Sequence, residues 1–271
     1  MAVTFTAITG YLVFTGSFDI QVLYLAISIF ILAGGSSALN ECQESKFDVQ
    51  MSRTKNRPIP SGKISLVNAW IVAAVFSVVG SFLLYVIFNQ MTALLGLINL
   101  IWYNIVYTNL KRITAYAVVP GSLVGAIPVF MGWTAGGGYV FDSAIVFIAF
   151  FLFIWQIPHF WLLMLKYGKD YERAGFPTIN QTLHPQNLKI LIFAWVLATS
   201  FSSIIVPLFL VNLSLSFFIL IFVLNILFIA IFTKLSFGKV AELSFKKTFI
   251  SINVYMFIFM IMLIVYHLNT A

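Results

Sequence analysis

Charged residues are scarce in this chain of 271 residues, where Asp, Glu, Lys and Arg together make up 8%. An ordinary soluble domain has about 25% charged residues, and a soluble globule of this size could not cover its surface with so few. A cytosolic enzyme and a disordered protein are therefore excluded. The chain has one cysteine, Cys42, so it cannot form an internal disulfide, and a disulfide scaffold is excluded as well.

Hydrophobic residues are abundant, at 61% of the chain, and they come in long unbroken runs. Runs of this kind indicate membrane-spanning helices, because the strands of a membrane barrel alternate in polarity. A spanning helix needs about 20 apolar residues. We predict an all-α integral membrane protein, with residues 1–271 as a single polytopic domain. Its nine expected spans are roughly 1–17, 20–39, 67–88, 91–109, 113–133, 141–165, 187–210, 213–233 and 247–267.

The basic residues predict the topology of these spans. All 15 Lys and Arg residues fall on the loops after the second, fourth, sixth and eighth spans, the last of which holds Lys234, Lys239, Lys246 and Lys247. Glu242 and five other acidic residues share this side. Because basic loops stay inside, we expect a cytoplasmic N-terminus and an external C-terminus. This topology accounts for the net charge of +7 better than nucleic-acid binding does. No secretory signal or transit peptide is evident, and we expect a bacterial plasma membrane.

The end of the second span carries a possible metal site. Asn40, Glu44 and Asp48 follow one another at intervals of four residues, so they share one face if the helix continues. Two carboxylates and an amide oxygen suit a hard cation such as Mg²⁺, which completes its coordination with water and substrate phosphates. The alternative is a helix end with solvated acidic side chains.

A basic loop follows directly, with Arg53, Lys55 and Arg57 before the helix breakers Pro58 and Pro60. Cations beside acidic residues could clamp an anionic substrate, and arginine can do so with two hydrogen bonds. The alternatives are that they only set the topology or bind anionic lipid headgroups. A diphosphate would be a natural single ligand for the loop and for a neighbouring Mg²⁺ site.

A third polar cluster ends the fourth span. Tyr103, Tyr107 and Lys111 are spaced by four residues and can share a face, and Arg112 follows. Tyrosine hydroxyls and cations suit phosphate oxygens. The alternative is an interfacial belt of aromatic residues with a lysine that reaches toward water.

The sixth span carries the fourth cluster, with Trp155, Gln156 and His159 about two turns before its cytoplasmic end. Pro158 is expected to kink the helix there. Polar groups at this depth usually face a bundle interior or a cavity, so a functional histidine is one interpretation. A polar contact between helices is the other.

These clusters together resemble the UbiA superfamily of intramembrane prenyltransferases. The matching motifs are N-x-x-x-E-x-x-x-D-x-x-M-x-R-T-K-N-R-P-I-P-S-G at 40–62, Y-N-x-x-Y-T-x-L-K-R-x-T at 103–114, G-A-I-P-x-x-x-G-W at 125–133, W-Q-I-P-H-F at 155–160 and D-Y-x-x-A-G-x-P at 170–177. The W-Q-I-P-H-F run points to the branch that prenylates heme over the branch that prenylates quinone precursors. The resemblance covers most of the chain up to about residue 180.

The chain departs from the family pattern in three places. Glu44 stands where the first motif usually has Asp, although glutamate still binds Mg²⁺. Lys166 stands four residues before Asp170, where the quinone branch has a second Asp, and this fits the heme branch. Members usually carry a basic residue before the first span, whereas the first here is Lys46, so we expect the natural start to lie further upstream.

The resemblance implies a helical bundle around a central cavity that is capped on the cytoplasmic side. It implies transfer of a farnesyl group from farnesyl diphosphate to a vinyl group of heme B, with Mg²⁺ or Mn²⁺ as the cofactor. A heme A synthase or a terminal oxidase would be a partner by family only. The alternatives are transfer to an aromatic quinone precursor, and a transporter or lipid-binding protein without catalysis. Motifs gathered at one membrane face favour a capped reaction chamber over a transporter, which often has broken helices at midplane.

The resemblance also assigns roles to residues. The expected metal ligands are Asn40, Glu44, Asp48 and Asp170. The expected diphosphate ligands are Arg53, Arg57, Tyr107, Lys111 and Arg112. The expected catalytic residues are Glu44, Asp48, Lys111 and Asp170, and the candidates for the heme side are Trp155, Gln156 and His159.

Overall fold

The computed structural model describes residues 2–210, 214–237 and 245–270, and all regular structure in these ranges is helical. The prediction of an all-α membrane protein is confirmed, since eight helical segments are long and apolar enough to cross a membrane. They are α2 (Ile20–Asp48), α3 (Leu66–Ile87), α4 with α5 (Gln90–Ile101, Thr108–Leu110), α6 with α7 (Val118–Gly121, Leu123–Ala135), α8 (Ser143–Arg173), α10 (Pro185–Ile205), α11 (Leu215–Phe237) and α12 (Phe245–Thr270).

The first predicted span forms a shorter helix, α1 (Ala2–Thr15). Its 14 residues are about 21 Å long at 1.5 Å per residue, whereas a bilayer core is about 30 Å thick. The helix packs against α2, α7 and α12. Gly10 and Gly132 allow the close approach to α7, because a Cβ atom on either one would run into a backbone carbonyl of the other helix. Eight of the nine expected spans therefore have full length, and α1 is a buried short helix.

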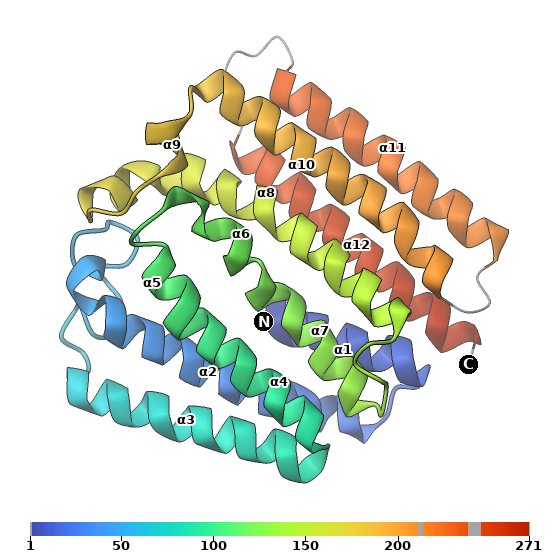
Figure 1. Ribbon diagram of the computed structural model, residues 1–271, viewed down its shortest axis with the longest axis horizontal. Coiled ribbons are helices and arrows are strands. Elements are labelled where there is room, and N and C mark those ends of the chain that lie inside the picture. Colours follow the sequence, from blue (N-terminus) through green and yellow to red (C-terminus); the bar gives the residue numbers. More distant parts are fainter. Residues whose placement is uncertain (1, 211–213, 238–244, 271) are drawn as a thin grey trace.

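The helices form a bundle in which α1 and α7 lie between two groups (Figure 1). Helices α2, α3 and α4 make one group, and α8, α10, α11 and α12 make the other. Between α2 and α3 the backbones nearly touch, because Gly35 faces the backbone of Ser77 and Gly80 faces that of Leu32. The hydrophobic effect does not drive helices together in lipid, since lipid chains are as apolar as leucine. Small residues stabilise the contact instead, because they let the backbones approach closely and pack.

The predicted cytoplasmic loops gather at one end of the bundle. Residues 49–65 after α2, the turn between α5 and α6, and the end of α8 with α9 (Ile179–Thr182) all lie there (Figure 1). This clustering agrees with the distribution of basic residues, although the side of the membrane stays a prediction. Lys239 and Glu242, which the sequence places at the same end, lie outside the described residues.

Candidate active site

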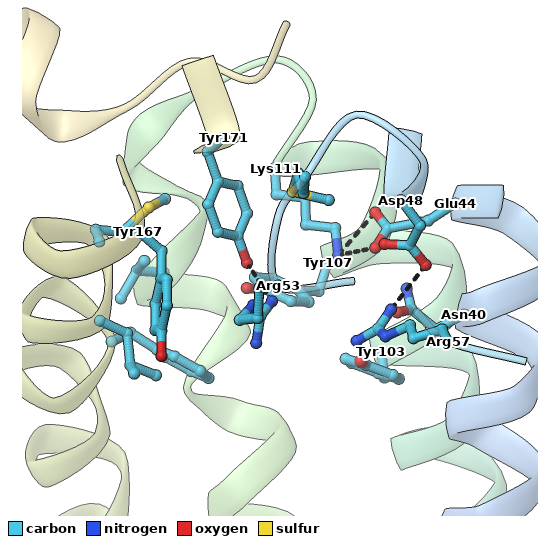
Figure 2. A pocket seen from close by; sticks show the side chains of 15 residues that line it. Asn40, Glu44, Asp48, Arg53, Arg57, Tyr103, Tyr107, Lys111, Tyr167 and Tyr171 are labelled. Carbon is cyan, nitrogen blue, oxygen red and sulfur yellow. Dashed lines mark hydrogen bonds and ion pairs between the residues drawn. The ribbon is translucent and has the colours of Figure 1, made fainter. Parts of the chain in front are cut away.

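A pocket of about 240 Å³ opens at this end, between α2 and the loop after it on one side and α8 on the other (Figure 2). Its walls combine charged side chains with aromatic and aliphatic ones. The lining residues are Asn40, Glu44, Asp48, Met51, Arg53, Arg57, Tyr103, Tyr107, Lys111, Val118, Phe160, Leu163, Met164, Tyr167 and Tyr171.

The polar face of α2 forms one wall. The helix continues without a break to Asp48, so Asn40, Glu44 and Asp48 share one face, as their spacing predicts. All three line the pocket and are buried, with Asp48 fully so. Asn40 Nδ2 donates a hydrogen bond of 2.9 Å to Thr108 Oγ1, which joins this wall to the end of the fourth span.

The fourth span widens into a π-helical turn over Trp102–Tyr107. Such turns are rare and are frequently found at functional sites. Here the turn brings the rings of Tyr103 and Tyr107 into a stack, with centroids 5.9 Å apart. Gly121 lets the Tyr107 ring lie against the backbone of α6, because a Cβ atom there would overlap the ring. Both tyrosines line the pocket, as their spacing from Lys111 predicts.

Two ion pairs line the pocket. Lys111 Nζ lies 2.8 Å from Glu44 Oε1, and Arg57 Nη1 lies 2.8 Å from Asp48 Oδ2. Burial lowers the pKa of Lys111, and the charge of Glu44 partly offsets this effect. Burial also acts to lower the pKa of Arg57, but the hydrogen bond and charge of Asp48 outweigh it and raise the pKa above its usual value.

Arg53 supplies a positive charge in excess of these pairs. Within the ranges that the structure describes, it forms no ion pair with a carboxylate. Its guanidinium donates a hydrogen bond of 3.1 Å to the Tyr171 hydroxyl and lies 5.3 Å from the centre of the Tyr167 ring (Figure 2). The pocket therefore holds three cations against two carboxylates, which suits an anionic ligand.

The donor set also fits a hard metal ion. Asp48 Oδ1 is buried and has no hydrogen-bond partner in the described part of the chain, so it is available to a cation. Nowhere in that part do three or more His, Cys, Asp or Glu side chains cluster as a complete metal site. Mg²⁺ ordinarily takes only one or two protein carboxylates and fills its shell with water and phosphate. Asn40, Glu44 and Asp48 match such an incomplete protein site.

Two of the predicted metal and diphosphate ligands do not line this pocket. The carboxylate of Asp170 accepts a hydrogen bond from Ser52 and lies 3.5 Å from Arg173 Nη1. Arg112 donates to the backbone carbonyl of Gln43 at 3.0 Å and stacks over the Phe47 ring. Both residues hold the rim of the pocket together, whereas the other predicted metal and diphosphate ligands face its interior.

The predicted heme-side residues lie behind the pocket wall. Trp155 Nε1 donates a hydrogen bond of 2.9 Å to the carbonyl of Ile252 on α12. His159 packs between the rings of Trp155 and Phe249, at centroid distances of 5.0 and 4.9 Å. Gln156 lies against Gly125 of α7, and its Oε1 is buried without a hydrogen-bond partner among the described residues. None of the three predicted residues contributes to the pocket lining.

Sequence reasoning missed the α8 wall of the pocket. This wall consists of Phe160, Leu163, Met164, Tyr167 and Tyr171. Phe160, Met164, Tyr167 and Tyr171 follow one another at three or four residues, and this spacing is the signal that could have identified one helix face. It was hidden because the other faces of this part of α8 are also rich in apolar residues.

The fold and the site define a multi-pass membrane protein with a polar, cation-rich pocket at one end of a helical bundle. Residues 2–266 match the model of the UbiA prenyltransferase family, and the chain belongs to this family. The family prediction is confirmed.

Curated relatives named protoheme IX farnesyltransferase are similar to this chain. The protein of Flavobacterium psychrophilum (strain ATCC 49511 / DSM 21280 / CIP 103535 / JIP02/86) is 37% identical over 181 residues, which cover 65% of this chain and 59% of that protein. The protein of Geobacter sulfurreducens (strain ATCC 51573 / DSM 12127 / PCA) is 37% identical over 189 residues, 69% of each chain. The match thus spans about three fifths of the length of the Flavobacterium relative.

Solved structures share the fold at low sequence identity. A structure from work on digeranylgeranylglyceryl phosphate synthase in membranes has a TM-score of 0.78 at 18% identity, covering 98% of this chain and 93% of that one. A UbiA homolog from Archaeoglobus fulgidus bound to GPP and Mg²⁺ has a TM-score of 0.71 at 16% identity, covering 98% and 94%. These likenesses establish the architecture of the bundle.

Proposed function

We propose that this protein transfers the farnesyl group of farnesyl diphosphate to a vinyl group of heme B. Three observations support the proposal. The curated relatives carry the name of this activity. The W-Q-I-P-H-F run at 155–160 is typical of the heme branch of the family. The most important observation is the pocket itself, where Arg53 has no carboxylate partner among the described residues. It lies beside two buried carboxylates that can share a metal ion with a diphosphate.

The diphosphate is held by the three cations of the pocket. Arg53 and Arg57 can each donate two parallel hydrogen bonds to phosphate oxygens, and Lys111 adds a point charge. The Tyr107 hydroxyl contributes a further donor. Asn40, Glu44 and Asp48 would hold Mg²⁺, and a bound Mg²⁺ neutralises charge on the leaving oxygens. Mn²⁺ has similar ligand preferences and is expected to substitute.

The reaction begins when the allylic C–O bond breaks and its electron pair leaves with the diphosphate. Arg53, Arg57 and Lys111 stabilise the negative charge that develops on the departing oxygens. The π electrons of the heme vinyl group then form the new C–C bond to the allylic cation. Water adds to the resulting cation on the heme side chain and loses a proton, which leaves a hydroxyl group. Phe160, Leu163 and Met164 exclude water from the allylic cation. The aromatic rings that line the pocket stabilise the positive charge of this cation.

The acceptor is proposed to approach from the side of Trp155, Gln156 and His159. The Phe160 ring connects the two regions, since its centroid lies 6.2 Å from that of Tyr107 in the pocket and 5.6 Å from that of His159. Gln156 Oε1 is buried without a hydrogen-bond partner among the described residues, so it can accept a hydrogen bond from a ligand there. A heme A synthase or a terminal oxidase as a downstream partner, and a bacterial plasma membrane with a cytoplasmic N-terminus, belong to the same proposal.

Membranes that contain the protein test this function when they are incubated with labelled farnesyl diphosphate, Mg²⁺ and one acceptor at a time. We expect label in extracted heme, with a mass increase of one farnesyl and one hydroxyl group, and release of diphosphate. Membranes without the protein provide the background. Label in a hydroxybenzoate or naphthoate and none in heme would replace heme B with a quinone precursor. No transfer to any acceptor would favour a transporter or lipid-binding protein.

A further inference from the structure

The loop after α2, residues 49–65, is fastened to the end of α8 by two neighbouring pairs of side chains. Ser52 donates a hydrogen bond to the Asp170 carboxylate, and Arg53 donates one to the Tyr171 hydroxyl. The paired residues are adjacent in both segments, so the contacts lie side by side. They connect positions 118 residues apart in the chain.

A small apolar cluster lies beside these two pairs. Met51, Ala174 and Phe176 are each 3–4% exposed and pack together with Phe47 and Tyr171 around them. The rings of Phe47 and Phe176 are 5.0 Å apart, and this contact joins the end of α2 to the segment after α8. The loop is thus held by packing as well as by hydrogen bonds.

Asp170 itself faces this contact. It is buried, at 9% exposure, and one of its oxygens accepts the Ser52 hydrogen bond. The other lies 3.5 Å from Arg173, whose side chain is 68% exposed, and an ion pair with so exposed a partner contributes little. Asp48, by comparison, lines the pocket, and its buried Oδ1 accepts no hydrogen bond from the part of the chain that the structure describes.

We propose that Ser52 and Asp170 form a latch that holds Arg53 at the pocket, and that Asp170 is a positioning residue and not a metal ligand. Arg53 is exposed and follows Ser52 directly, so a loop released from α8 would let its guanidinium move into solvent. Fixing a flexible arginine before the substrate arrives removes an entropy cost from binding. The role in catalysis rests on the proposed function, whereas the latch itself does not.

Hydrogen exchange without substrate tests the latch directly. Ser52→Ala, Asp170→Asn and the double variant are compared with wild type for exchange in peptides from residues 49–63. We expect faster exchange in each single variant and no further increase in the double variant, because both changes act on the same contact. Ser52→Ala removes the donor, and Asp170→Asn removes the charge that strengthens the hydrogen bond. Ser52→Thr keeps the hydroxyl and is expected to retain protection. Gln50→Ala is the control, since Gln50 is exposed and its side chain donates to the backbone carbonyl of Lys46 on α2, away from α8.

Kinetics then separate a latch from a metal ligand. In both single variants we expect KM for farnesyl diphosphate to rise about tenfold, the factor for a lost charge-assisted hydrogen bond. We expect kcat to stay within about twofold and the Mg²⁺ concentration for half-maximal activity to stay unchanged. A higher Mg²⁺ requirement in Asp170→Asn but not in Ser52→Ala would overturn the proposal, as would unchanged exchange in both. If the wild type transfers no farnesyl group, the exchange result still decides whether the latch exists.

Discussion

Lys111 Nζ lies 2.8 Å from both carboxylate oxygens of Glu44, a residue 67 positions earlier in the chain. The side chains of Lys111 and Glu44 are only 11% and 6% exposed, so the pair is largely shielded from water. It joins α2 to the turn after α5. When one partner of a buried pair is removed, the other charge remains without compensation.

Lys111→Met should therefore destabilise the protein as well as weaken its use of diphosphate. We expect a loss of about 3 kcal/mol in the free energy of unfolding, the scale for breaking a buried pair. The double variant Glu44→Gln/Lys111→Met should recover part of this stability without recovering activity. Thermal unfolding in detergent, together with KM for farnesyl diphosphate, measures both effects. A single variant as stable as wild type would show that the pair is not buried in the folded protein.

Arg53→Lys keeps the charge but loses the planar fork that binds phosphate with two hydrogen bonds. We expect KM for farnesyl diphosphate to rise about tenfold, with kcat changed less than about threefold. Steady-state kinetics in reconstituted membranes measure the change. Lys63→Ala, in the same loop but outside the pocket lining, is the control and should behave as wild type. Equal kinetics for Arg53→Lys and wild type would contradict a role in diphosphate binding and favour the alternative that Arg53 only sets the membrane topology.

Asp48→Asn removes the negative charge of the carboxylate whose Oδ1 has no hydrogen-bond partner among the described residues. We expect a higher Mg²⁺ concentration for half-maximal transfer, because an amide is a poorer ligand for a hard cation than a carboxylate. Excess chelator should stop transfer by the wild type, and added Mg²⁺ or Mn²⁺ should restore it. Undiminished transfer in excess chelator would show that the reaction does not need a divalent metal ion.

Gly121→Ala places a Cβ atom against the rigid ring of Tyr107, so this ring of the pocket lining has to shift. We expect a loss of activity of tenfold or more while the variant still inserts and folds. Gly34→Ala is a matched control, because its Cβ would lie 3.3 Å from the Phe76 side chain, on α3. Activity assays at equal protein in the membrane compare the two. If both variants are equally active, the Tyr107 ring has no fixed position in the site.

The C-terminal helices are held by a buried polar network apart from the pocket. The Tyr255 hydroxyl lies 2.7 Å from Ser203 Oγ and 2.9 Å from Asn225 Oδ1, which joins α12 to α10 and α11. Tyr255→Phe should lower stability by about 1 kcal/mol, the usual scale for hydrogen bonds between membrane helices. Unfolding in detergent measures this change, and KM for farnesyl diphosphate should not move. A changed KM with unchanged stability would place Tyr255 in substrate binding.

The sequence predicted the bundle because apolar run length and charge placement are sufficient to locate membrane helices. It also predicted that Asn40, Glu44 and Asp48 face one way, since α2 continues to Asp48. The length of α1 was overestimated, because Gly10 and the threonines beside it continue an apolar run without indicating where the helix meets the bilayer. Composition alone does not record depth in the membrane.

The site was predicted less completely where a role depends on contacts between distant segments. Asp170 and Arg112 carry the right charges for the pocket, yet Ser52 and Phe47 hold them at its rim. Tyr167 and Tyr171 carry no charge, and only the fold brings them next to Arg53. The spacing of residues within one helix could be predicted from the sequence. The side-chain contacts between α8 and the loop after α2 could not.

The most direct test is a structure of the protein with Mg²⁺ and an unreactive farnesyl thiodiphosphate. We predict a diphosphate within hydrogen-bond distance of Arg53, Arg57 and Lys111, and a metal ion that is coordinated by the carboxylate of Asp48. A diphosphate bound at any other part of the molecule, with these side chains still paired only to one another, would contradict it.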